Sequence, residues 1–147
     1  MNTTTKGIKL LIALCIVFHL ASCAISSERK LSQENKLVGE WIGTDSTGKT
    51  GTFIFNNDGS AKLIKDNKVF DGSSVGGALT WKLDDNHDPM HLDLVMSNKS
   101  GGSRKLPMII RFLGENKLQV CISEDKKSRP IGFLEAEDKN RIILKRQ

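Results

Sequence analysis

The sequence lacks the patterns by which most hydrolases, redox enzymes and metalloproteases are recognised. It has no C-x-x-C pair, no H-E-x-x-H motif and no nucleophile elbow, in which a serine sits at a sharp strand-to-helix turn. Aromatic residues make up only 5% of the chain. We therefore expect neither enzymatic activity nor a bound cofactor. A length of 147 residues allows one domain with an appendage.

A long apolar run is also missing. The longest one, Leu10–Phe18, follows Lys6 and Lys9 and has nine residues, whereas a membrane-spanning helix needs about 20. A basic segment followed by a short apolar run is typical of an export signal. We interpret residues 1–22 as a signal peptide that is not part of the fold.

The end of this run, Leu20-Ala21-Ser22-Cys23, resembles the lipobox of bacterial lipoproteins. The resemblance implies that Cys23 becomes the first residue of the mature chain and carries fatty acyl chains such as palmitate. Two or three acyl chains suffice for stable anchoring in a membrane. Because Ala24 stands where aspartate would favour the inner membrane, the resemblance implies a cell-envelope lipoprotein, in the outer membrane of a Gram-negative cell.

Cysteine is scarce, which excludes an internal disulfide. Cys15 would leave with the signal peptide and Cys23 would be acylated, so Cys121 would remain alone. The 125 residues that remain would carry a formal charge of +3, which is too small to indicate a nucleic-acid partner. We interpret residues 23–36 as the lipidated N-terminus and a flexible tether, and residues 37–147 as the folded domain.

In the predicted domain, apolar and polar residues alternate with a period of two, and turn sequences such as Asn56-Asn57-Asp58-Gly59 separate the alternating segments. About eight strands at a spacing of roughly ten residues are typical of an antiparallel barrel or sandwich. Pro107 is expected at an edge, a bulge or a rim. The alternation predicts one buried face formed by Met90, Leu92, Leu94, Leu106, Met108, Ile110, Leu118, Val120, Ile142 and Leu144.

Three segments resemble lipocalins and bacterial lipocalin-like domains. Gly39-Glu40-Trp41 resembles the G-x-W opening, residues 52–60 are similar to a hairpin of the bacterial group, and residues 118–121 with Arg129-Pro130-Ile131-Gly132-Phe133 resemble its ending. The resemblance implies an up-and-down antiparallel barrel across the whole domain. It also implies that an arginine lies across Trp41. We expect Arg146 in this role, with Arg129 as the second candidate.

The aromatic and aliphatic residues of the strands are candidates for a barrel interior. An eight-stranded barrel is just wide enough to be filled by side chains or to hold one small ligand. Two functions therefore stay open: binding or carrying a small apolar molecule, or an envelope interaction or inhibitor role that uses the loops of a filled barrel. The expected lining residues are Trp41, Phe53, Phe55, Trp81, Leu92, Leu94, Met108, Ile110 and Val120.

The segment from Gly43 to Thr50 matches the P-loop expression G-x-x-x-x-G-K-[ST]. A P-loop needs a following helix whose N-terminus holds the phosphates, but the next residues are strand-like. We interpret this segment as a polar hairpin loop with Gly48 in a turn.

The remaining polar clusters are expected to be structural. His87 and His91 lie near several aspartates in the sequence, so a metal site is conceivable. Because His91 and Asp93 lie opposite the apolar face, a solvated polar surface without metal is the favoured interpretation. Cys121 is expected to be a small structural residue, and residues 126–129 a solvated basic loop.

Overall fold

The computed structural model describes residues 33–45, 47–123, 125–134 and 140–147. The chain divides into two units, residues 1–35 and residues 36–147, and the described strands belong to the second. The predicted signal peptide, Cys23 and most of the predicted tether lie outside the described residues. Among the helical residues that the structure describes, none belongs to a segment long and apolar enough to cross a bilayer.

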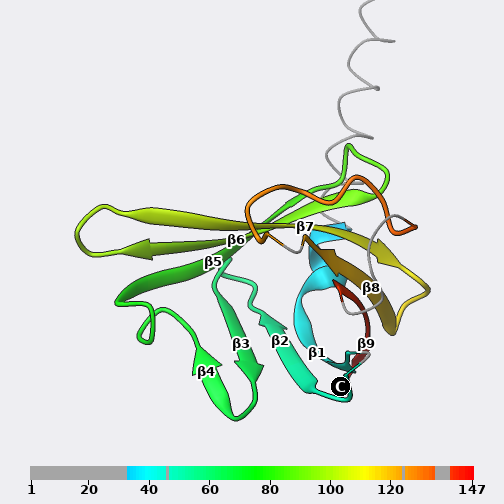
Figure 1. Cartoon of the computed structure of the whole chain (residues 1–147), viewed down its shortest axis with the longest axis horizontal. Helices are drawn as coiled ribbons and strands as arrows, with labels where there is room; N and C mark the ends of the chain where they lie inside the picture. Colours follow the sequence, from blue (N-terminus) through cyan, green and yellow to red (C-terminus); the bar gives the residue numbers. More distant parts are fainter. Residues whose placement is uncertain (1–32, 46, 124, 135–139) are drawn as a thin grey trace, which may run out of the picture. The chain divides into compact units, whose positions relative to one another are not determined.

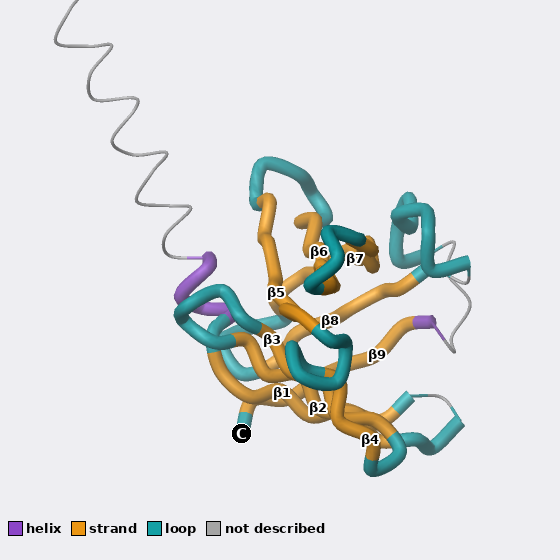
Figure 2. Tube along the Cα trace, turned by 90° about the vertical axis from the view of Figure 1, so that its left-hand side faces the viewer, coloured by secondary structure: helices purple, strands orange, loops and turns teal. Residues whose placement is uncertain are grey.

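The second unit is an antiparallel β-sheet that curls into a nearly closed barrel (Figures 1 and 2). The strands in chain order are β1 (Gly39–Thr44), β2 (Thr50–Phe55), β3 (Ala61–Lys65), β4 (Lys68–Phe70), β5 (Gly77–Asp84), β6 (Met90–Asn98), β7 (Ser103–Phe112), β8 (Lys117–Ile122) and β9 (Arg141–Arg146). Their spatial order is β4-β3-β2-β1-β9-β8-β7-β6-β5. The predicted all-β, up-and-down barrel is confirmed.

Two pairings close the barrel. The first and last strands pair antiparallel, with Trp41 opposite Arg146. On the other side, β4 pairs with residues 63–65 of β3, and β5 reaches the start of β3 through a single bridge between Ser60 and Thr80. Strands β4 and β5 thus share one edge of β3. Nine described strands therefore follow the path of an eight-stranded barrel, with the three-residue β4 as the addition.

The predicted alternation places the apolar face inward. Leu92, Leu94 and Met108 are almost inaccessible to solvent, as are the other predicted core residues Ile110, Leu118, Val120 and Leu144. Met90, Leu106 and Ile142 are partly buried against the same core. Successive side chains of a strand point to opposite faces, so one alternating register suffices to bury all ten. The predicted core is confirmed.

A second, smaller apolar cluster lies on the outer face of the sheet. It consists of Ile109, Cys121 and Phe133, all buried. The Arg111 guanidinium lies 4.7 Å from the centre of the Phe133 ring. The segment around Phe133 thus covers the outside of β7 and β8, which explains why apolar Ile109 interrupts the alternation. Cys121 is a buried structural residue, and burial raises the pKa of its thiol.

Pro107 lies where the pairing of β7 with β8 has ended. The last pair between these strands is Met108 with Ile122, whereas on the other side Pro107 is opposite Asp93 of β6. A proline has no N–H to donate, so it is tolerated where a strand has no partner on one side. Pro107 thus lies at a local edge of the sheet, which is one of the expected positions.

Candidate functional site

A pocket of about 180 Å³ lies at one end of the barrel, which we call the open end. Here β1 and β8 finish and β2 and β9 begin. Charged side chains of Asp45, Lys49, Lys65 and Lys126 surround the mouth. The apolar wall is formed by Phe53, Leu63, Leu106, Ile122, Ile142 and Leu144. The arrangement offers an apolar interior with a polar entrance.

Two glycines help to make room for this pocket. Gly43 and Gly51 lie opposite each other in the β1–β2 pair, and both line the pocket. At Gly43 the neighbouring strand β9 comes so close that an added Cβ would lie 2.4 Å from the Ile143 carbonyl oxygen. Glycine is therefore required at position 43 for β1 and β9 to approach each other.

Two of the three lysines around the mouth form ion pairs. The Lys65 Nζ lies 3.8 Å from the Asp45 carboxylate, and the Lys49 Nζ lies 3.8 Å from that of Asp66. A hydrogen bond from the Thr47 hydroxyl and the backbone N–H of Lys49 lower the pKa of Asp45. Lys49 and Lys65 are each offset by a carboxylate, whereas no salt bridge among the described residues involves Lys126.

The P-loop match is a hairpin loop, as the sequence analysis predicts. The Asp45 N–H donates to the Lys49 carbonyl, and the Gly48 N–H donates to the Asp45 carbonyl. Gly48 has a φ of 82°, in the left-handed region that a turn requires. Strand β2 follows in place of a helix, so no helix N-terminus is available to hold phosphate.

The expected ligand-lining residues are inside the barrel, but most of them do not reach the pocket. Of the nine, only Phe53 lines it. Trp41, Phe55 and Leu92 are packed in the core away from it, and Trp81 donates from its indole Nε1 to the Asn56 carbonyl at 3.0 Å. The sequence analysis did not assign the other pocket residues to a ligand. The pocket lies at one end of the barrel, whereas the predicted lining residues extend into its middle.

The opposite end of the barrel, which we call the closed end, is filled by Trp41. Its indole Nε1 donates to the Leu37 carbonyl at 2.8 Å, and its ring contacts Phe112 with 6.2 Å between ring centres. The Arg146 guanidinium lies 4.2 Å from the Trp41 ring centre and donates to the carbonyls of Val38 and Lys36. The contact expected from the resemblance to lipocalins is present.

Gly39, the first residue of the G-x-W segment, is required at this end. Its φ is 134°, a value that residues other than glycine rarely adopt. A Cβ there would lie 2.6 Å from Arg146 Nη1. The glycine therefore leaves the space through which the arginine crosses to the tryptophan.

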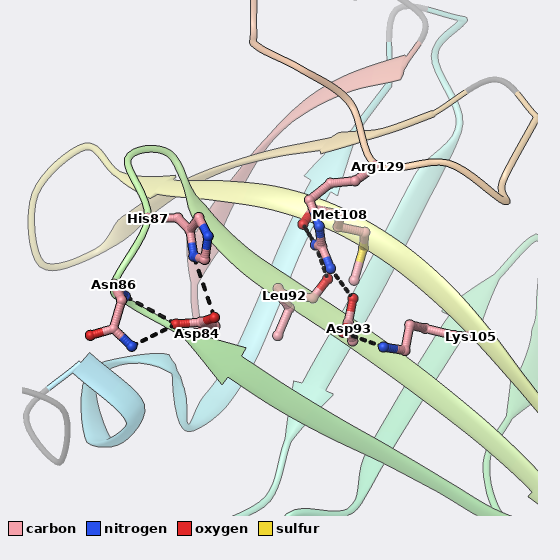
Figure 3. A network of polar contacts seen from close by, with 8 residues as sticks. All are labelled: Asp84, Asn86, His87, Leu92, Asp93, Lys105, Met108 and Arg129. Carbon is pink, nitrogen blue, oxygen red and sulfur yellow. Dashed lines mark hydrogen bonds and ion pairs between the residues drawn. The ribbon is translucent and has the colours of Figure 1, made fainter.

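Arg129, the second candidate, binds elsewhere. Its guanidinium donates to the Met108 carbonyl and, at 2.5 Å, to the Asp93 carboxylate (Figure 3). Lys105 lies 3.0 Å from the same carboxylate. Two expectations are corrected here. Arg129 is not part of a solvated basic loop, and Asp93, whose side chain is only 14% exposed, does not face open solvent.

Asp84, His87 and His91 gather at the turn between β5 and β6. Figure 3 shows the first two of them. Asp84 and His91 are directly opposite in the β5–β6 pair, and His87 Nδ1 lies 3.3 Å from the Asp84 carboxylate. The two imidazole rings stack with 3.8 Å between their centres. Burial, followed by the positive charge of Arg129, lowers the pKa of His91. The polar groups of this surface thus form a compact cluster, in which the side chains of His87 and Asp84 are 51% and 46% exposed.

The sequence analysis does not count residues 72–76 as a nucleophile elbow, although Gly72-Ser73-Ser74-Val75-Gly76 fits the letters G-x-S-x-G. This segment forms turns between β4 and β5 and leads into a strand. The Ser74 hydroxyl accepts a hydrogen bond from the Asp71 N–H and donates one to the Asp71 carbonyl. A nucleophile elbow needs a following helix, so this serine is held in a loop rather than presented for catalysis.

The arrangement of the site is thus a small apolar pocket at one end of the barrel, an arginine-capped tryptophan at the other, and two polar clusters beside β6. No model of a known protein family matches the sequence, and a search of curated proteins finds no significant relative.

Proposed function

We propose that this protein is a lipid-anchored lipocalin-like protein of the cell envelope that binds or carries a small apolar molecule in the open end of its barrel. The observation that supports this proposal most is the pocket of about 180 Å³, with its apolar wall, in a barrel whose opposite end is filled. The proposed function needs no covalent step. It is binding rather than catalysis.

The size of the pocket limits the ligand. Benzene occupies an apolar cavity of about 150 Å³, and drug-sized molecules need roughly 300–1,000 Å³. A pocket of about 180 Å³ accommodates one ring or a short branched chain. A larger lipid would insert one end and leave the rest outside the mouth.

Ligand binding is tested by filling the pocket. Leu106→Trp places a large side chain in the apolar wall. We expect it to weaken at least tenfold the binding of 1-anilinonaphthalene-8-sulfonate, an anionic environment-sensitive dye whose phenyl ring would enter the pocket while its sulfonate stays at the mouth. The matched control is Leu113→Trp, because Leu113 is 46% exposed in the turn between β7 and β8 and does not line the pocket. Equal dye affinity for both variants would contradict a pocket-bound ligand.

Lipid anchoring is tested at the cysteine of the lipobox-like segment. We expect Cys23→Ser to abolish incorporation of radiolabelled palmitate and to leave uncleaved precursor. Cys15→Ser changes the same atom within the predicted apolar run and serves as the control, with normal labelling expected. Normal labelling of the Cys23 variant would remove the anchor from the proposal.

A second candidate function has one observation in its favour. Ile131 and Leu134 are 88% and 94% exposed on the segment that covers β7 and β8. Exposed apolar side chains close together are a feature of protein interaction sites. An envelope interaction or inhibitor role through this segment would be lost in Ile131→Ser/Leu134→Ser, measured by crosslinking in intact cells. Dye binding in the pocket would stay unchanged in that double variant.

A further inference from the structure

We propose that Asp84, His87 and His91 form a binding site for a divalent ion of the late first-row metals, with zinc as the representative ion. This site lies at the turn between β5 and β6 and shares no residue with the pocket at the open end. It therefore stands independently of the proposed ligand-binding function.

The three side chains already lie at nearly the right separation. Their ligand atoms are all within 4.8 Å of one another. In a tetrahedral zinc site with bonds of about 2.0–2.1 Å, ligand atoms are about 3.4 Å apart. A contraction of at most about 1.5 Å completes the site. The His87 side chain can supply this movement because it is 51% exposed and lies in the turn.

The other two residues are held by the sheet. Asp84 and His91 face each other across β5 and β6, so the backbone pairing sets their separation. The backbone N–H of Asn86 and its side-chain amide both donate to Asp84 Oδ1, at 3.1 Å and 2.8 Å. The other carboxylate oxygen, Oδ2, faces His87 (Figure 3). Hydrogen bonds that orient a ligating carboxylate are typical of the surroundings of metal sites.

The kind of ligand atoms determines the class of metal. Two imidazole nitrogens and one carboxylate oxygen suit zinc, copper and nickel, whereas magnesium and calcium prefer oxygen ligands alone. Three protein ligands leave one position of a tetrahedral ion for water. The other carboxylates of the turn, those of Asp85 and Asp88, are not among the ligating groups, and the positive charge of Arg129 near His91 opposes a cation.

The test uses the full chain in detergent micelles, stripped of metal with a chelator and titrated with zinc chloride in a calorimeter. We expect one equivalent to bind. His87→Ala and His91→Ala should each weaken zinc binding at least tenfold, and Asp85→Asn, the matched control, should change it less than twofold. Cobalt(II) provides a second readout, because a tetrahedral site gives intense visible absorption that should disappear in the two histidine variants.

The melting temperature of each metal-free variant shows whether weaker zinc binding results from the loss of a ligating side chain or from unfolding. His87 is exposed, so His87→Ala should keep the melting temperature of the metal-free protein, and this variant alone decides the question if His91→Ala fails to fold. No zinc uptake by the unaltered protein would overturn the proposal. Uptake that His87→Ala leaves unchanged would overturn it too.

Discussion

The closed and open ends of the barrel are built from the same strands but differ in what their side chains do. At the closed end, Leu37 and Trp41 are fully buried, and Arg146 covers the tryptophan. At the open end, a pair of glycines, Gly43 and Gly51, stands where larger side chains would fill the space. Side-chain packing at the closed end therefore stabilises the fold, whereas the open end leaves a volume that a ligand can enter. A protein that must bind through its interior can place the two properties at opposite ends of each strand.

The largest expected effect is a difference between the two ends in the cost of truncation. Trp41→Ala should lower the free energy of unfolding by about 3–5 kcal/mol, because a fully buried aromatic side chain leaves a cavity. Ile142→Ala should cost only about 1–2 kcal/mol, since Ile142 is partly buried and already borders the pocket. Urea unfolding of both variants measures the difference. Equal costs would mean that the two ends are packed alike.

A smaller effect is expected at the arginine cap. Arg146→Gln removes the cation over Trp41 and the hydrogen bonds to the Val38 and Lys36 carbonyls, so we expect a loss of about 1–3 kcal/mol. Arg146→Lys keeps the charge but not the planar group that reaches two carbonyls, and should lie in between. Urea unfolding followed by tryptophan fluorescence measures both. An unchanged stability in Arg146→Gln would show that the tryptophan is held by packing alone.

The buried face of the strands and the closed end were largely predictable from the sequence because their signals are local. Alternation with a period of two identifies the buried face of a strand without knowledge of its partners, and the ten predicted core residues followed from it. The G-x-W segment and a terminal arginine were sufficient for the contact of Trp41 with Arg146. The same alternation is present in β5, where Leu79, Trp81 and Leu83 share a face, and could have indicated that strand.

The open end and the polar clusters were not predictable because they depend on register between distant segments. The pocket exists where Gly43 lies opposite Gly51 and β9 comes close, and no local pattern specifies that pairing. Arg129 meets Asp93 across 36 positions of sequence. The histidines were recognised as a possible cluster, but Asp84 rather than Asp93 joins them, since the β5–β6 register places Asp84 beside His91.

The smallest effect is expected at Lys49, and it tests whether the P-loop-like segment has any role beyond that of a hairpin. The lysine side chain is 57% exposed, and its ion pair with Asp66 spans 3.8 Å. Exposed ion pairs contribute about 0–1 kcal/mol, so Lys49→Ala should change the stability by less than about 0.5 kcal/mol. Because Lys49 lies at the mouth and not in the apolar wall, the affinity for a neutral apolar ligand should change less than twofold. Calorimetry should detect no ATP binding by either protein.

Gly43→Ala is the informative comparison for Lys49→Ala. The more important of the two residues is the lysine in a P-loop but the glycine in this hairpin. In a P-loop the lysine is the essential residue, since it reaches the phosphates. In this barrel Gly43 matters more, because a Cβ there would overlap the Ile143 carbonyl and force β1 and β9 apart. Overpacking of this kind costs typically about 1–3 kcal/mol. We therefore expect Gly43→Ala to destabilise the fold clearly while Lys49→Ala does not. The reverse ranking, or ATP binding that disappears in Lys49→Ala, would contradict the hairpin interpretation and support phosphate binding at the open end.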